Sequence, residues 1–132
     1  MVADASVVVA LLLTPAGLEG RVLAAAEWLA VPDLLDLEVA QVLRRRVMAG
    51  VLSPGHAETA LGRLRELPAA RHQHGRLLSR AWELRHNLTI YDACYVALAE
   101  ALAVPLVTAD IAMADVPGVR CEVRVVGAVG SP

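Results

Sequence analysis

The chain has 132 residues, 57% of them hydrophobic, with 14 acidic residues against 12 basic ones and a net charge of −2. This length predicts one domain with a substantial core, and the near-neutral charge indicates neither a nucleic-acid binder nor an acidic tail. Every basic residue is Arg, so the chain lacks the lysine that a P-loop or a Schiff-base enzyme requires. Both of these classes are excluded.

The first half of the chain alternates strand-like and helical segments. In chain order we predict a strand at 1–5, a helix at 6–13 with Ser6 as N-cap, a break at 14–17, a helix at 18–27, a strand at 28–32, a helix at 33–49 that Gly50 ends, and a helix at 53–67. The last of these helices begins with Ser and then Pro, which is the favoured order of an N-cap and a first-turn residue.

The second half continues the alternation. We predict an edge strand or loop at 68–75, helices at 75–87 and 89–103, a strand at 104–110, a short helix or turn at 109–118, a strand at 120–126 and a flexible tail at 127–132. Short apolar strands that alternate with longer helices predict an α/β domain over residues 1–126, with a parallel sheet covered on both faces.

The cysteine content and the lengths of the apolar runs predict where the protein resides. Cys94 and Cys121 are far apart and lack metal-ligand spacing, so we expect reduced thiols in a cytosolic protein. No apolar run approaches the ~18–20 residues of a membrane span. Residues 7–13 faintly resemble a signal peptide, but Asp4 stands where its basic region would be. We therefore expect a cytoplasmic protein without membrane contact.

Acidic residues occur where strands end and helices begin. Asp4 and Asp110 each follow a predicted strand, Asp92 opens the helix before the second of these strands, and Glu38 lies on the helix at 33–49. Sites in parallel sheets form beyond the carboxyl ends of strands, near a topological switch point. Asp36 is two residues from Glu38, and on a helix the two side chains diverge by about 200°, so only one can face such a site.

Each acid also has a simpler interpretation when it is taken alone. Asp4 suits a turn, Asp110 suits a cap, Glu38 suits a solvated helix face, and Asp92 suits the first turn of a helix that Thr89 caps. Together, however, several buried like charges would repel and raise one another's pKa values. No lysine is present to neutralise them, which favours a hard divalent cation, Mg²⁺ or Mn²⁺.

Four segments, VADASVVVALL, LEVAQVL, YDACYVALA and LVTAD, resemble in this order and spacing the four acidic motifs of PIN domains. They are similar in particular to the VapC-type toxins of bacterial toxin–antitoxin pairs. The resemblance covers nearly the whole chain. It implies a three-layer α/β/α sandwich with a mostly parallel sheet, a Mg²⁺- or Mn²⁺-dependent endoribonuclease, a homodimer and a cognate antitoxin that buries apolar surface.

The resemblance also implies roles for single residues. The catalytic and metal-binding acids would be Asp4, Glu38, Asp92 and Asp110, supported by the hydroxyls of Ser6 and Thr108. Gln41 stands where the family often has asparagine. A fifth acid is common after the fourth, and here only Asp115 is near, so one metal or two stays open. A metal-activated water would hydrolyse RNA and leave a 5′-phosphate and a 3′-hydroxyl.

Other residues leave alternatives open. Arg44, Arg45 and Arg46 either hold RNA phosphates or form a solvated face. His72 and His74 lack a third ligand and are expected to be exposed. Tyr91, Tyr95 and Trp82 either stack on bases or pack in the core or a dimer.

Three other functions also use acids at strand ends or a PIN-like fold. A receiver domain fails for want of lysine, and a haloacid-dehalogenase-like phosphatase fails because Ser6 stands where it needs aspartate. A catalytically silent PIN-like module that binds RNA or a partner peptide is the alternative that stays open.

Overall fold

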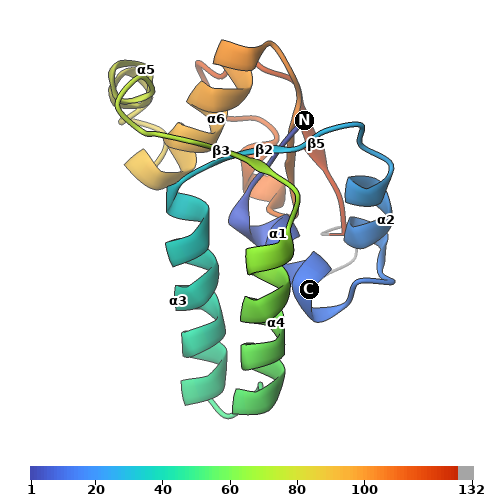
Figure 1. The fold of residues 1–132 in the computed structure, drawn as a ribbon. Helices are drawn as coiled ribbons and strands as arrows, with labels where there is room; N and C mark the ends of the chain where they lie inside the picture. The colour runs from blue at the N-terminus through green and yellow to red at the C-terminus, as the bar shows by residue number, and fades with distance from the viewer. Residues whose placement is uncertain (128–132) are drawn as a thin grey trace.

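The computed structural model describes residues 1–127 and is built around a five-stranded sheet (Figure 1). The strands are β1 Val2–Ala3, β2 Ala30–Pro32, β3 Ala70–His72, β4 Leu106–Thr108 and β5 Val123–Val125. The helices are α1 Ala5–Leu13, α2 Leu18–Ala24, α3 Leu34–Met48, α4 Pro54–Glu66, α5 Leu78–Glu83, α6 Ile90–Leu102 and the short 3₁₀ helix η1 Ile111–Met113.

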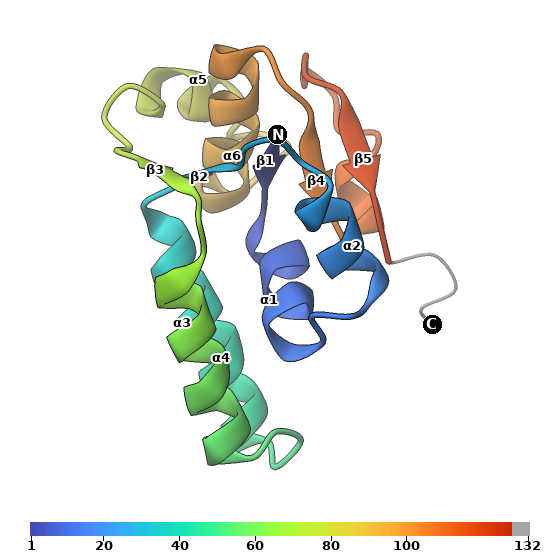
Figure 2. The same cartoon turned by 45° about the vertical axis from the view of Figure 1, so that its right-hand side comes forward.

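The sheet has the order β3–β2–β1–β4–β5, and every neighbouring pair is parallel. The chain moves from β1 to β2 and β3 on one side, then returns to place β4 on the other side of β1. Because parallel crossovers are right-handed, this reversal puts α5 and α6 on the face opposite α1 and α2 (Figure 2). The result is the expected α/β/α sandwich, with its switch point between β1 and β4.

The core is aliphatic, as the composition predicts. Val2, Val31 and Leu106 on the sheet are fully buried, and α6 is buried along the whole run 93–99 because it lies across the sheet. Small alanines in this helix allow its backbone to approach the strands closely. Among residues 1–127, the buried polar residues are Asp4 and Thr108 alone, and both lie where the sequence places the site.

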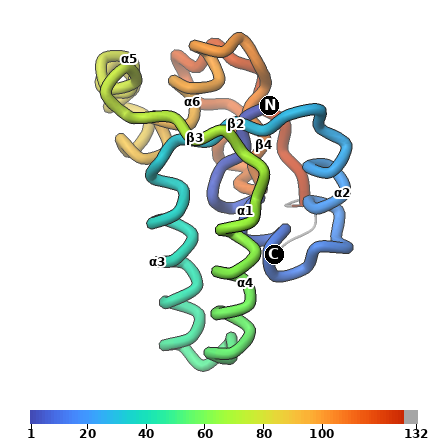
Figure 3. The backbone as a smooth tube through the Cα atoms, viewed as in Figure 1, coloured from blue at the N-terminus to red at the C-terminus, as the bar shows by residue number. Residues whose placement is uncertain are grey.

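Helices α3 and α4 form a hairpin that projects away from the sheet (Figure 3). Gly50 ends α3 with a positive φ of 76°, which a residue without a Cβ adopts readily. The Ser53 hydroxyl then accepts the backbone N–H of His56 at 3.1 Å and caps α4. Both predicted signals are confirmed.

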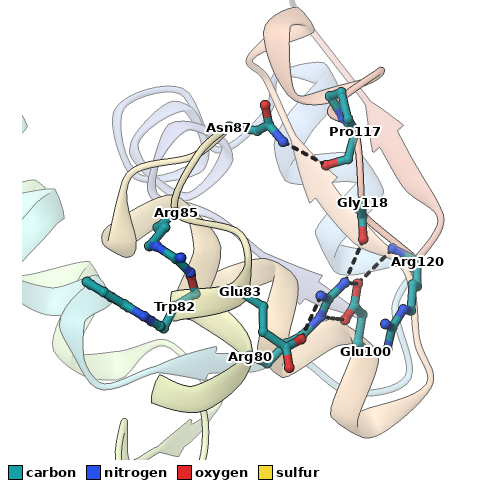
Figure 4. Close-up of polar contacts among 9 residues, drawn as sticks. All are labelled: Arg80, Trp82, Glu83, Arg85, Asn87, Glu100, Pro117, Gly118 and Arg120. Carbon is teal, nitrogen blue, oxygen red and sulfur yellow. Dashed lines mark hydrogen bonds and ion pairs between the residues drawn. The ribbon is translucent and has the colours of Figure 1, made fainter.

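A half-buried ion pair joins α5, α6 and the segment before β5 (Figure 4). Arg80 donates to both carboxylate oxygens of Glu100, at 2.7 and 3.2 Å, and to the carbonyl of Gly118 at 2.6 Å. The backbone N–H of Arg120 donates to the same carboxylate at 2.7 Å. These contacts fix the outer helix layer to the edge of the sheet.

Several predicted boundaries are wrong. Asp4, not Ser6, caps α1, because its side chain accepts the N–H of Val7. The predicted helices at 18–27 and 75–87 are shorter, since the chain must turn after Ala24 to enter β2 and after Glu83 to enter α6. The edge strand at 68–75 is present as β3.

Three further expectations concern the chain as a whole. The prediction of a single domain over residues 1–126 stays a prediction. The predicted tail at 127–132 lies outside the described residues, apart from Gly127. Within those residues no single helix is long and apolar enough to cross a membrane; α1 and α2 pass that test only as a pair bent by 107°.

Candidate active site

The candidate site lies beyond the carboxyl ends of β1 and β4, which are adjacent in the sheet. Ala3 pairs with Val107 in the parallel register, and the backbone N–H of Asp4 donates to the Val107 carbonyl at 3.1 Å. Asp4 and Asp110, one residue and two residues past their strands, therefore emerge at the same edge. This edge is also the switch point of the sheet, where sites in such folds form.

Two hydroxyls hold the buried carboxylate of Asp4. Ser6 Oγ donates to Asp4 Oδ1 and Thr108 Oγ1 donates to Asp4 Oδ2, each at 2.5 Å. The backbone N–H of Val7 adds a third bond at 3.3 Å. Burial nevertheless raises the pKa of Asp4 above its ordinary value, and these hydrogen bonds offset the rise only in part.

The same two hydroxyls connect Asp4 to the turn that carries Asp110. Ser6 Oγ accepts the N–H of Ala109 at 2.9 Å, and Thr108 Oγ1 accepts the N–H of Asp110 at 3.0 Å. The turn that carries Asp110 therefore lies beside Asp4, and the roles of these residues stay a prediction. Asp110 itself is exposed, and one of its oxygens accepts the N–H of Ala112 at 2.9 Å, so its capping interpretation also holds.

Asp92 reaches the site from the first turn of α6. Thr89 caps that helix by accepting the N–H of Asp92 at 3.1 Å. Burial, and then the charges of Asp4 and Asp110, raise the pKa of Asp92, while the nearby Thr89 hydroxyl lowers it. The coupling places Asp92 electrostatically beside both strand-end acids.

Glu38 faces the same space, while Asp36 does not. Asp36 forms a two-bond ion pair with Arg71 on β3, with both N–O distances 2.9 Å. Burial raises the pKa of Glu38, the Tyr95 hydroxyl lowers it, and the charges of Asp92 and Asp4 raise it further. The divergence expected for residues two apart on a helix is therefore observed, with Glu38 on the side of the other acids.

A tyrosine that the sequence suggested only for stacking or packing lies at the base of this cluster. Tyr95 is 1% exposed, and its hydroxyl is near enough to Glu38 to affect that carboxyl's pKa. No hydrogen bond of ordinary geometry joins the two groups, however. Within residues 1–127, Glu38 Oε1 and Tyr95 Oη are the two buried side-chain oxygens without a partner. The signal available in the sequence was spacing, since Tyr95 is one helical turn after Asp92.

The remaining predicted residues lie outside the cluster. Arg44, Arg45 and Arg46 are exposed on the second half of α3, and Asp115 is exposed after η1. Tyr91 and Trp82 are also exposed, at 63% and 61%, and Trp82 stacks under Arg85 at 4.8 Å (Figure 4).

The expectation that both histidines are exposed is wrong. His72 and His74 are half-buried, the first because it belongs to β3 and the second because its Nε2 accepts the N–H of Leu34 at 2.8 Å. That bond holds the start of α3.

The chemistry of the donor set suits a hard divalent cation. All four groups are carboxylates, the ligands that Mg²⁺ and Mn²⁺ prefer. Among residues 1–127 none of the four forms an ion pair with an Arg, and Glu38 Oε1 is free to accept a partner. Over the same residues, no three His, Cys, Asp or Glu side chains are already arranged as a group of metal ligands.

Known proteins match both the sequence and the fold. The family model of the PIN domain matches residues 1–119. Ribonuclease VapC1 of Mycobacterium tuberculosis is 49% identical over 96 residues, which are 72% of each chain. VapC ribonuclease Mb0985 of Mycobacterium bovis is 44% identical over 126 residues, covering 96% of this chain and 98% of that one.

Two solved structures share the fold. PAE2754 from Pyrobaculum aerophilum superposes with a TM-score of 0.70 and 24% identity, covering 94% of this chain and 82% of that one. VapC20 of Mycobacterium tuberculosis, a sarcin–ricin loop cleaving toxin, gives a TM-score of 0.62 and 19% identity over 80% and 85% of the two chains.

Proposed function

The chain belongs to the PIN domain family, and from that premise we propose that it is a metal-dependent endoribonuclease that acts as the toxin of a toxin–antitoxin pair. One observation carries the proposal. We infer that Asp4, Glu38, Asp92 and Asp110 form one cluster at the switch point of the sheet, because burial first, and the charges of neighbouring acids after it, raise the pKa values of Glu38 and Asp92. Clustered carboxylates repel one another and would also repel the negative phosphates of RNA. A bound cation would neutralise part of this charge.

We assign the four carboxylates as the ligands of Mg²⁺ or Mn²⁺. When bound, such an ion supplies Lewis acidity and a water of lowered pKa. Ser6 and Thr108 keep the Asp4 carboxylate oriented, and by accepting the N–H groups of Ala109 and Asp110 they hold the second strand end in place. We expect hydrolysis to leave a 5′-phosphate and a 3′-hydroxyl, and 2′,3′-cyclic phosphate products would argue against it.

The test compares two acids of one helix. Glu38→Gln removes a proposed ligand, whereas Asp36→Asn removes an acid that points toward Arg71. With a defined RNA pool and Mg²⁺ or Mn²⁺, we expect cleavage by the wild type and by Asp36→Asn, and none by Glu38→Gln or with EDTA. Equal cleavage by both variants would place the chemistry elsewhere. An inactive wild type would favour a silent binding module.

We propose Arg45 as the phosphate-binding member of the three consecutive arginines. It is seven residues after Glu38, so it lies within about 20° of the same helix face and ~10 Å further along the axis. Arg44 points about 120° away from Glu38 on the same geometry. Arg45→Ser should therefore raise KM for RNA and make the dependence of KM on salt concentration less steep, while Arg44→Ser should change KM little.

We propose two protein partners and a cytoplasmic location, where RNA is available. The α3–α4 hairpin exposes Leu37, Met48 and Val51 at 77%, 73% and 74%. Apolar surface of this kind suits a second copy of the chain or a cognate antitoxin, whose basic side chain would complement the acidic site. The mass in solution, measured by light scattering for the chain alone and beside the product of an adjacent gene, tests both partners.

A further inference from the structure

The two unpartnered buried oxygens of Glu38 and Tyr95 are the starting point. A buried hydroxyl without a hydrogen bond is destabilising, and phenylalanine would fill the same space without that penalty. Tyr95 is nonetheless present in a helix whose other buried residues are Ala, Cys, Val and Leu. Packing alone therefore does not explain why this position carries a hydroxyl group.

The position of the hydroxyl indicates this use. Tyr95 lies one helical turn after Asp92, so both side chains leave the same side of α6. The charges of Glu38, Asp4 and Asp92 all act on the hydroxyl, and Glu38 acts most strongly. A phenol carries one O–H donor, and Glu38, the acid whose charge acts on this hydroxyl most strongly, has an unpartnered buried oxygen.

We propose that Tyr95 is a positioning residue whose hydroxyl donates a hydrogen bond to the Glu38 carboxylate when a divalent cation occupies the acid cluster. Glu38 has three rotatable bonds and no other partner for Oε1, so its carboxylate is not held in one orientation. A bond from Tyr95 to one oxygen leaves the other oxygen aimed at the cation. Asp4 already has this kind of support from Ser6 and Thr108. The inference rests on the proposed function, because it requires the metal site.

The chain contains a matched control. Tyr91 is on the same helix and is the other tyrosine of the sequence, but it is 63% exposed. Tyr95→Phe and Tyr91→Phe each remove one hydroxyl from α6 and nothing else. In EDTA we expect neither variant to have a lower Tm than the wild type, because neither hydroxyl has a hydrogen bond to lose in the metal-free fold. A structural role for Tyr95 would instead lower its Tm.

The decisive measurement is Mn²⁺ binding, followed by the electron paramagnetic resonance signal of the free ion. We expect Tyr95→Phe to bind Mn²⁺ about 10–100-fold more weakly, the usual effect of losing a residue that orients a metal ligand. Tyr91→Phe should bind like the wild type. In a Glu38→Ala background, Tyr95→Phe should cause no further loss, because the hydroxyl acts through Glu38.

The outcomes separate this inference from the proposed function. Equal Mn²⁺ affinity of Tyr95→Phe and wild type overturns the role of Tyr95 and leaves the metal site standing. A further loss in the Glu38→Ala background overturns the route through Glu38. A wild-type chain that binds no Mn²⁺ overturns the metal site and this inference together.

Discussion

Replacing Thr108 by valine tests the support of the Asp4 carboxylate. Valine keeps the size and branching of Thr108, which is fully buried, and removes its hydroxyl. The change deletes a 2.5 Å bond to Asp4 Oδ2 and a 3.0 Å bond from Asp110 N–H. A hydrogen bond to a charged group contributes about 1.5–3 kcal/mol and a neutral one about 0.5–1.5 kcal/mol. We therefore expect the free energy of unfolding to fall by about 2–4 kcal/mol.

Urea unfolding in EDTA measures this loss, and the midpoint should fall by roughly 1–2 M. Thr59→Val is the matched control, because the exposed Thr59 hydroxyl only donates to the Gly55 carbonyl within α4. Its cost should stay within about 0.5 kcal/mol. If Thr108→Val is no more destabilising than Thr59→Val, the hydroxyl does not support Asp4 and the reasoning is refuted.

Three further changes follow from the same contacts. In EDTA, Asp92→Asn should increase the free energy of unfolding relative to wild type near pH 8, and should do so less near pH 4.5. The raised pKa of Asp92 means that its charged form destabilises the folded state, and this effect appears as the pH rises above the ordinary pKa of 3.8. Urea unfolding at both pH values measures the difference. Arg80→Ala should lower the free energy of unfolding by about 2–4 kcal/mol, because the Glu100 side chain, 12% exposed, loses its ion pair. Arg80→Lys should lower it by less, because lysine keeps the charge but cannot bond both carboxylate oxygens of Glu100. His74→Ala should cost about 0.5–2 kcal/mol and speed hydrogen exchange of the Leu34 amide, which NMR resolves.

The sequence predicts the order of strands and helices because period and composition change sharply between them. The boundaries of α2 and α5 were harder to predict. After Ala24 and Glu83 the residues still suit a helix, but the chain turns there to reach β2 and α6. The positions of the sheet and α6 impose these turns. They follow from tertiary packing, which a local sequence pattern does not contain.

The site was predictable to the extent that strand ends define it. Asp4 and Asp110 each follow a predicted strand, and the carboxyl ends of parallel strands lie at the same edge of a sheet. That β1 and β4 are direct neighbours there is a finding of the structure. Serine is a common N-cap, so the sequence favours Ser6 as the cap of α1. In the structure Asp4 is the cap, and Ser6 donates a hydrogen bond to its carboxylate. The missing partner of Tyr95 depends on the depth of α6 and the rotation of Glu38, which no sequence pattern specifies.

The unfavourable features of this fold collect at one end of the sheet. Three carboxylates with raised pKa values and the two unpartnered buried oxygens lie together there. The half-buried charges of Arg80 and Glu100, in contrast, are paired with each other. A chain selected for stability alone would give these carboxylates and oxygens partners, or replace the residues that carry them. A single divalent cation would stabilise the charged carboxylates and, by orienting Glu38, give Tyr95 its partner. Binding of Mn²⁺ should therefore raise the Tm more in wild type than in Tyr95→Phe, by a margin that grows with pH as the carboxylates ionise.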